Sequence, residues 1–599
     1  EIIGWMYQYY ISEKKDEVFE GLKKNIKITK ENIPAATQLF TPDWIVKYMV
    51  ENSLGRLWLE GHPDEELRSK WEYYLEEAEQ EPEVQKQLEE IRAKSRDIRP
   101  EDIKVLDPAM GSGHILVYAF DVLYDIYKSA GYSERDIPRL ILENNLYGLD
   151  IDDRAAQLAY FAVMMKARSK SRRIFREKVN VNVCAIQESN GFPKEAIDYL
   201  VNPEETEIEK RIHREDVEYL INVFNDAKEY GSILEVKPID FDAIERRLEE
   251  IRNGGTQDLF EYQYRNIILE KIPALVKQAR IMSQKYDVVC TNPPYMGDGG
   301  MNIILKNYLS RNFPKSKGDL STVFMETSIN YCNSIGFMAM INIPSWMFLT
   351  SYTLLRKDII MKNTIINMMH LGRGIFGSDF GTTSFIIRKC NINSYLARYK
   401  KLFFNQGEVD SIESKEKMFF IDDNEFLNRQ ENYISLPNYS IAYWISEKIK
   451  TVFQKSNNLK DIADARQGLI TGDNDRFLRY WFEIEFEKIG FNYICSEQTQ
   501  NNRHKWYPYN KGGSFRKWYG NNEYVVNWQN EGYEIRNYKD SSGKLRSRPQ
   551  NINYYFKKGI TWSSLTISTF SARYSKTGFI FDAKGSTCFL KDNNNLYYI

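Results

Sequence analysis

Three short motifs place small, acidic and amide residues at points where apolar runs end. They are 107–113 (DPAMGSG), 148–151 (GLDI) and 292–295 (NPPY). Each follows a strand-like run, and the carboxyl ends of parallel strands meet at one edge of a sheet. The order and placement therefore predict one site to which all three motifs contribute.

The first motif suits a cationic ligand. Gly111 and Gly113 allow the backbone of the turn, with Pro108 and Ala109, to approach a ligand without Cβ obstruction. The helix that follows offers free N–H groups. Asp107 at the strand end favours a cationic amino-acid group over a phosphate. A tight turn without a ligand is the alternative for the glycines alone.

The second motif is typical of ribose binding. We expect Asp150 to accept hydrogen bonds from ribose hydroxyls, with Ile151 beside it. The acid follows the glycine turn by about 40 residues, compared with roughly 20 in a dinucleotide fold, so NAD is disfavoured. The alternative is that Asp150 only caps the helix that follows.

The third motif indicates chemistry on an aromatic amine. The adenine amine is a poor nucleophile because its lone pair is delocalised into the ring. The Asn292 side-chain oxygen and the Pro293 carbonyl, in a backbone stiffened by Pro294, can accept hydrogen bonds from its two protons and direct the lone pair toward a methyl sulfonium. Tyr295 offers a face on which an extruded base can stack.

The three motifs in this order resemble the gamma class of amino-methyltransferases, which use S-adenosyl-L-methionine. The resemblance extends to 37–42 (TQLFTP), where it implies that Thr37, Phe40, Thr41 and Pro42 close over the methionine part of the cofactor. A plain helix start is the other interpretation, with Thr41 as N-cap and Pro42 in the first turn. Both interpretations are compatible.

In greater detail the chain resembles the PglX family of adenine-specific methyltransferases from bacteriophage-exclusion (BREX) systems. Matching stretches span most of the chain and include VLDPAMGSGHILVYAFDVLYDIY, ENNLYGLDIDDRAAQLAYFAVMMKA, LGRGIFGSDFGTTSFI and GLITGDNDRFLR. Met110 departs from related turns, which often carry cysteine. The resemblance implies double-stranded DNA and other BREX proteins as partners.

Two further assignments follow from the resemblance. Gln187 or Glu188 lies where the class places a residue near the cofactor adenine. Phe376 or Phe380 is a candidate second aromatic wall for the flipped base, with ordinary core packing as the alternative.

A basic, aromatic-rich stretch predicts a DNA-facing surface. The net charge of the chain is only -2, but 501–580 contains about 14 Lys and Arg against about 4 Asp and Glu. An exposed basic loop without a partner is the alternative. The candidates for phosphate contacts are Arg503, Lys505, Arg516, Lys517, Arg546, Arg548 and Arg573.

The elements that must position these residues predict an α/β fold: a Rossmann-like class I methyltransferase sheet with helical insertions, then a mixed or mainly β target-recognition domain. The six cysteines are scattered singly and indicate no zinc site. The expected ranges are 1–60 for a helical segment with the closing motif, 61–103 for a charged, exposed helical insertion, 104–395 for the methyltransferase domain with an insertion at about 204–284, and 396–599 for a linker and a truncated recognition domain.

The predicted function is site-specific methylation of adenine N6 in a cytoplasmic protein, since no apolar run is long enough for a membrane span. Three alternatives stay open. The chain could be part of a fused restriction-modification enzyme, a DNA-sensing subunit that is active only with partner proteins, or a protein glutamine methyltransferase, although the basic second domain speaks against the last. We expect the chain to belong to a longer polypeptide.

Overall fold

The computed structural model describes residues 12–24, 26–201, 206–256, 258–377, 380–405, 407–456, 458–541, 543–564 and 569–591. The first residues of the expected amino-terminal segment lie outside these ranges. The chain divides into two compact units, 1–450 and 451–599. Among the described residues, no helix combines the length and apolar character that crossing a bilayer requires.

A nine-stranded sheet forms the centre of the first unit, in the order β3-β2-β1-β4-β5-β7-β6-β8-β9. Its first five strands run parallel, and β7 is antiparallel to both of its neighbours. The strands are β1 Val105–Asp107, β2 Leu146–Asp150, β3 Asn182–Ala185, β4 Tyr286–Thr291, β5 Cys332–Asn342, β6 Thr364–Arg373, β7 Gly381–Arg388, β8 Leu396–Lys401 and β9 Glu425–Arg429.

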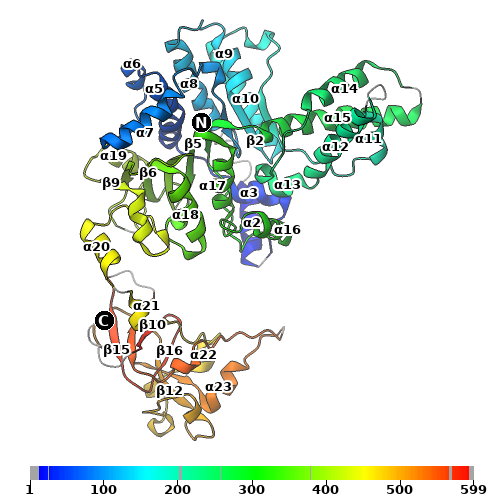
Figure 1. The fold of residues 1–599 in the computed structure, drawn as a ribbon. Helices are drawn as coiled ribbons and strands as arrows, with labels where there is room; N and C mark the ends of the chain where they lie inside the picture. The colour runs from blue at the N-terminus through cyan, green and yellow to red at the C-terminus, as the bar shows by residue number, and fades with distance from the viewer. Residues whose placement is uncertain are drawn as a thin grey trace. The chain divides into compact units, whose positions relative to one another are not determined.

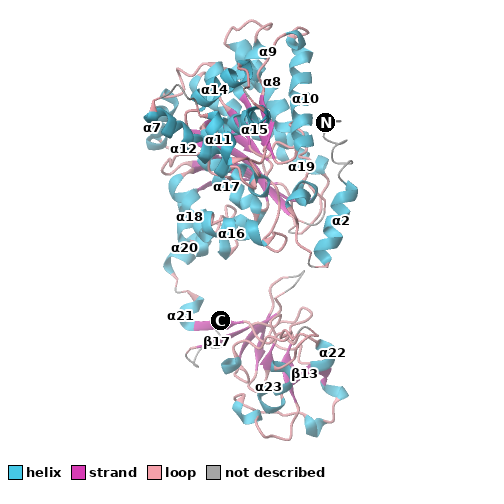
Figure 2. Ribbon diagram, turned by 90° about the vertical axis from the view of Figure 1, so that its right-hand side faces the viewer, coloured by secondary structure: helices cyan, strands magenta, loops and turns pink. Residues whose placement is uncertain are grey.

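Helices cover both faces of this sheet (Figure 2). The strand order runs from β1 to β3 in one direction and from β4 to β5 in the other. Because crossovers between parallel strands are almost always right-handed, this reversal is expected to place their helices on opposite faces. Helices α4 Asp43–Val50, α8 His114–Ser129 and α10 Asp153–Lys170 pack together in one layer. Helices α17 Leu320–Tyr331 and α18 Thr353–Lys362 pack on β4, β5 and β6. The expected Rossmann-like class I methyltransferase sheet is confirmed.

The expected insertion at about 204–284 forms a helical arm at the side of the sheet (Figure 1). Its helices are α11 Lys194–Leu200, α12 Glu207–Val223, α13 Ala227–Tyr230, α14 Phe241–Asn253 and α15 Leu259–Ser283. The arm begins before residue 204, because α11 packs against α15. It leads directly into β4, the strand that precedes NPPY.

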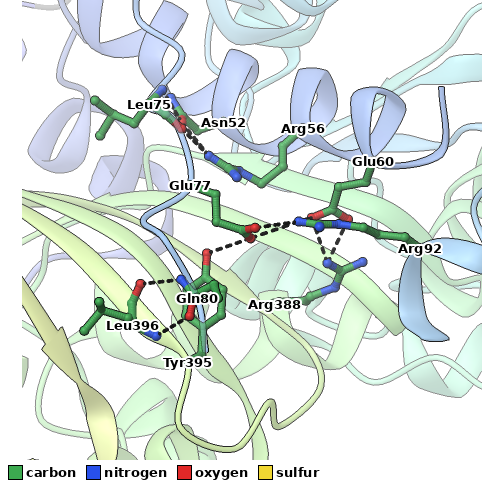
Figure 3. Close-up of polar contacts among 10 residues, drawn as sticks. All are labelled: Asn52, Arg56, Glu60, Leu75, Glu77, Gln80, Arg92, Arg388, Tyr395 and Leu396. Carbon is green, nitrogen blue, oxygen red and sulfur yellow. Dashed lines mark hydrogen bonds and ion pairs between the residues drawn. The ribbon is translucent and has the colours of Figure 1, made fainter. Parts of the chain in front are cut away.

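The charged segment 64–99 differs from the exposed helix that we expected. It contains two helices, α6 Glu65–Arg68 and α7 Pro82–Ala93, but the residues between them are turns and extended chain. This connection approaches the sheet and joins a buried network of charges (Figure 3). The Arg388 side chain, fully buried on β7, contacts Glu60 at 2.8 Å, and Arg92 contacts Glu77 at 2.9 Å.

The network predicts a large stability effect at Glu60, which lies in the last turn of α5 Arg56–Gly61. Glu60→Ala leaves the Arg388 guanidinium buried without its carboxylate, and breaking a buried pair costs about 3–5 kcal/mol of unfolding free energy. Chemical denaturation should show this loss. Glu66→Ala, at an exposed carboxylate, should change stability little, and an equal effect of both variants would contradict the assignment.

The second unit is mainly strand and loop with short helices (Figure 2). Its two four-stranded sheets have the orders β10-β17-β14-β15 and β11-β13-β12-β16. The strands are β10 Ala463–Arg466, β11 Leu478–Tyr480, β12 Trp506–Asn510, β13 Tyr524–Asn527, β14 Gly559–Trp562, β15 Ala572–Ser575, β16 Ile580–Phe581 and β17 Thr587–Leu590. The range 396–599 that we expected for a linker and this domain contains two parts: β8 and β9 pair onto the sheet of the first unit, and the second unit begins at residue 451.

Candidate functional site

The three motifs meet at one cavity in the first unit, at the carboxyl ends of β1, β2 and β4. Its walls therefore combine residues more than 250 positions apart in the sequence. The predicted residues that line it are Thr37, Phe40, Thr41, Asp107, Pro108, Ala109, Gly111, Asp150, Ile151, Asn292 and Pro294. Pro42, Gly113, Gln187, Glu188, Pro293 and Tyr295 are not in this lining.

The glycine turn is held in place by the second motif. Gly111 and Gly113 have φ of +53° and +81°, which side chains disfavour. The Gly111 N–H donates to Asp150 Oδ2 at 2.9 Å, and the Asp152 N–H donates to Asp150 Oδ1 at 2.9 Å. Asp150 thus organises the turn, whereas the N-cap of the next helix, α10, is Asp152 and not Asp150. Each of its oxygens retains a second lone pair for a ligand.

Asp107 presents one free carboxylate oxygen. Its Oδ1 accepts hydrogen bonds from the Thr291 hydroxyl at 2.7 Å and the Ala109 N–H at 3.1 Å. Its Oδ2 is buried and has no hydrogen-bond partner within the described part of the chain. Burial raises the pKa of Asp107 to about 7. Burial also raises the pKa of Asp150 to about 6, although the backbone N–H groups that donate to this carboxylate partly oppose the rise. A buried acceptor without a donor fits a cationic ligand group.

Asn292 joins the third motif to residues 37–42, which we call the closing segment. Its Nδ2 donates to the Thr41 hydroxyl at 3.0 Å and to the Leu39 carbonyl at 3.2 Å. Its Oδ1 accepts the Tyr295 hydroxyl at 2.8 Å, which also contacts the Ile341 carbonyl at 3.0 Å. We expected this amide oxygen to accept a hydrogen bond from an amine. The Tyr295 hydroxyl already occupies it, so an amine can reach the oxygen only if the hydroxyl moves away or both donors bond to the oxygen together.

Three aromatic rings gather beside Asn292. The Tyr295 ring centroid lies 6.1 Å from that of Phe376 and 5.6 Å from that of Phe380. All three side chains are only partly buried, so they form a surface that a planar ligand can reach. Both phenylalanines that the resemblance offered as candidates therefore lie beside Tyr295, and their role as a wall for an extruded base stays a prediction.

The closing segment leads into α4 one residue later than expected. The helix begins at Asp43 with Pro42 as its N-cap, and the Thr41 hydroxyl bonds to Asn292 rather than capping the helix. The Phe40 ring packs edge-on against His114, with centroids 4.6 Å apart. His114 follows the glycine turn directly, so this contact fastens the closing segment to the first motif.

The helical arm supplies a wall that sequence reasoning missed. Residues 228–232 line the cavity. Gly231 has φ of +64°, and a Cβ there would meet Ile151 Cγ2 at 2.7 Å. The Ser232 hydroxyl donates to the Pro108 carbonyl at 2.5 Å. The only sequence signal was a glycine in an otherwise charged segment, which is too weak to place it.

Gln187 and Glu188 lie near the rim of the cavity. Glu188 pairs with Lys30 at 3.1 Å and accepts the Lys228 N–H at 3.1 Å, so it links the amino-terminal segment to the arm. The Gln187 side chain donates to Asp153 at 2.6 Å. Their expected contact with a cofactor adenine stays a prediction.

Six of the seven basic residues singled out in the second unit are exposed: Arg503, Lys505, Arg516, Lys517, Arg546 and Arg548. Arg573 is the exception, and its assignment as a surface contact was wrong. Its side chain is buried on β15 and donates to the Ser563 hydroxyl at 3.2 Å. Successive side chains of a strand point to opposite faces, and Arg573 lies on the inner face of β15. The basic composition of the stretch had suggested that this residue lies at the surface.

Comparison with known proteins gives consistent matches. Residues 144–376 match the family model described as "Eco57I restriction-modification methylase". Over its whole length the chain is 41% identical to "Adenine-specific methyltransferase BrxX" of Escherichia coli O9:H4 (strain HS), of which it covers 49%. It is 40% identical to "Adenine-specific methyltransferase PglX" of Lacticaseibacillus casei (strain Zhang), of which it covers 50%. The chain thus spans about half the length of these curated relatives.

A solved structure is also similar to this chain. It is "ATP-dependent Type ISP restriction-modification enzyme LlaBIII bound to DNA", with a TM-score of 0.49 and 12% identity. The alignment covers 98% of this chain and 36% of that one.

Proposed function

We propose, from the similarity of this chain to the adenine-specific methyltransferases PglX and BrxX, that it belongs to their family and methylates adenine N6 in DNA as part of BREX defence. One observation carries the proposal: the cavity joins the free, buried oxygen of Asp107 to the side chain of Asn292. A cation-binding carboxylate and an amine-orienting amide at one site fit a sulfonium methyl donor and an amine acceptor.

The cavity residues fit S-adenosyl-L-methionine. When bound, this cofactor supplies an electrophilic methyl group. Asp107 Oδ2 would hold the cationic amino group, and the N–H groups after the glycine turn would face its carboxylate. Asp150 would accept from the ribose hydroxyls while it holds Gly111. Thr37, Phe40, Thr41 and Pro42 would cover the methionine part, and Gln187 or Glu188 would lie toward the adenine.

Asn292 and Pro293 would orient the target amine. The Asn292 amide is fixed by two bonds to the closing segment, so its oxygen keeps one direction. This oxygen and the Pro293 carbonyl would accept hydrogen bonds from the two N–H groups of the amine and turn its lone pair toward the methyl group. Tyr295, with Phe376 or Phe380, would stack the extruded base, and the Tyr295 hydroxyl would give up its bond to Asn292 as the base enters.

We assign DNA recognition to the second unit. Its exposed cations Arg503, Lys505, Arg516, Lys517, Arg546 and Arg548 would contact phosphates. Contacts of this kind position the protein on the duplex without reading its sequence. Double-stranded DNA and other BREX proteins are the partners that we propose, with the cytoplasm as the compartment.

Gly231→Ala tests the wall that the arm supplies. The new Cβ would push Ile151 or the arm segment into the cavity, and a strained site costs of order 1–3 kcal/mol, so we expect cofactor affinity to fall about tenfold. Titration calorimetry with S-adenosylhomocysteine measures it. Gly255→Ala, elsewhere in the arm where a Cβ meets open space, is the matched control. Equal affinities for both variants would remove the arm from the binding site.

The proposed activity is tested by long-read detection of modified adenines in cells with and without the gene that encodes this chain. We expect N6-methyladenine at one recurring sequence only in cells that carry the gene. Purified protein, assayed alone and with the other BREX proteins, separates an autonomous enzyme from a subunit that needs partners. Unmethylated adenine under all these conditions would refute the proposal.

A further inference from the structure

We propose that Trp518 is a preformed aromatic contact for DNA in the second unit, and that its ring stacks on a nucleobase or wedges between two. Trp518 is 76% exposed, which is unusual because tryptophan side chains are on average largely buried. Its backbone has φ of +71°, in the left-handed region that bulky side chains avoid. An exposed tryptophan on a strained backbone requires an explanation other than packing.

The surrounding structure holds this strained position firmly. The Trp518 N–H donates to the Ala572 carbonyl at 2.9 Å, and the Tyr574 N–H donates to the Trp518 carbonyl at 2.8 Å. Residue 518 thus pairs with β15, the edge strand of its sheet. The Asn521 side chain closes the loop through the Ser514 carbonyl at 3.0 Å. Strain that is maintained by fixed backbone bonds is a common mark of a binding position.

The charges around the ring favour a nucleic acid as its partner. Arg516 and Lys517 are exposed, and the ion pairs found in the described part of the chain involve neither of them. The Lys576 ammonium lies 6.0 Å from the Tyr519 ring centroid. Cations without a carboxylate partner beside exposed rings match a polymer in which phosphates alternate with flat bases.

Phe482 provides a contrast within the same unit. It is also exposed, at 66%, but it lies in a segment with Glu483, Glu485 and Glu487. Carboxylates at this density repel phosphates, so the same kind of ring there is not expected to contact DNA. Comparing Trp518 with Phe482 therefore separates two effects on DNA binding, the presence of an exposed ring and the place of that ring on the surface.

The inference rests on the proposed DNA methyltransferase function, and the experiment separates the two. Fluorescence anisotropy with a labelled duplex compares the chain with its Trp518→Ala and Phe482→Ala variants. Since stacking of one base is worth about 1–3 kcal/mol, we expect Trp518→Ala to weaken binding about tenfold, Phe482→Ala to leave it unchanged, and Trp518→Phe to restore most of it. The fluorescence of a duplex that contains 2-aminopurine should change more with the chain than with Trp518→Ala.

Each outcome decides one of the two claims. If the unaltered chain does not bind duplex DNA, the proposed function loses its DNA-binding basis. If it binds and Trp518→Ala binds equally well, or loses only an RNA probe, the Trp518 contact is overturned. Trp518→Gly guards against misfolding, because glycine tolerates φ of +71° without strain and still removes the ring.

Discussion

Replacing Asn292 by alanine is expected to abolish adenine methylation while the protein still binds its cofactor. The substitution removes the oxygen that we propose accepts an amine proton, and losing one preorganised group of this kind costs about 100-fold or more in turnover. Cofactor affinity should change little, because Asp107, Asp150 and the glycine turn remain intact. Single-turnover methylation and calorimetry with S-adenosylhomocysteine measure the two effects separately.

The contacts of Asn292 with the closing segment require a further variant. Thr41→Val removes the hydroxyl that accepts the Asn292 amide but keeps the amide itself, so it should lower turnover less than Asn292→Ala. Asn312→Ala, at an exposed asparagine on α16 Ile303–Asn312, controls for the substitution as such. Parallel loss of cofactor binding and methylation in Asn292→Ala would assign the residue a structural role instead.

The meeting of the three motifs could be predicted because it depends on topology alone. Asp107 and Asp150 end their strands and Asn292 directly follows its strand, and parallel strands bring their carboxyl ends together whatever the rest of the chain does. The aromatic group of Tyr295, Phe376 and Phe380 depended instead on the family resemblance. The connection between β6 and β7 has no period that reveals where its rings point.

What could not be predicted depends on long-range packing. Gly231 reaches Ile151 only because the arm folds back onto the sheet, and the charged sequence of the arm gives no sign of this. Glu60 and Arg388 lie 328 positions apart, so their buried pair is invisible in either local sequence. Arg573 was assigned to the surface from composition, which carries no information about which face of a strand a residue occupies.

Cofactor binding is expected to strengthen with pH because of Asp107. Burial raises the pKa of this carboxyl to about 7, so near neutral pH part of the protein holds a protonated, neutral Asp107. Only the carboxylate attracts a cationic amino group, so affinity is greatest between about pH 7 and the pKa of that amino group, roughly 8, and it falls as the pH drops below 7. Below the pKa of Asp107 the decline approaches tenfold per pH unit, and binding releases a proton to the buffer.

Asp107→Asn should remove this dependence and lower affinity at pH 7.5 by about 10- to 100-fold, the value of a charge-assisted hydrogen bond of about 1.5–3 kcal/mol. The amide can still accept from Thr291 and Ala109, so the turn should persist. Calorimetry in buffers of different ionisation enthalpy counts the released protons. Asp136→Asn, at an exposed carboxylate, is the matched control.

Below about pH 6 the unaltered chain and Asp107→Asn should share a smaller decline in affinity, because burial raises the pKa of Asp150 to about 6. An unchanged slope between pH 6 and pH 7.5 in Asp107→Asn would mean that the free oxygen of Asp107 does not face the bound amino group.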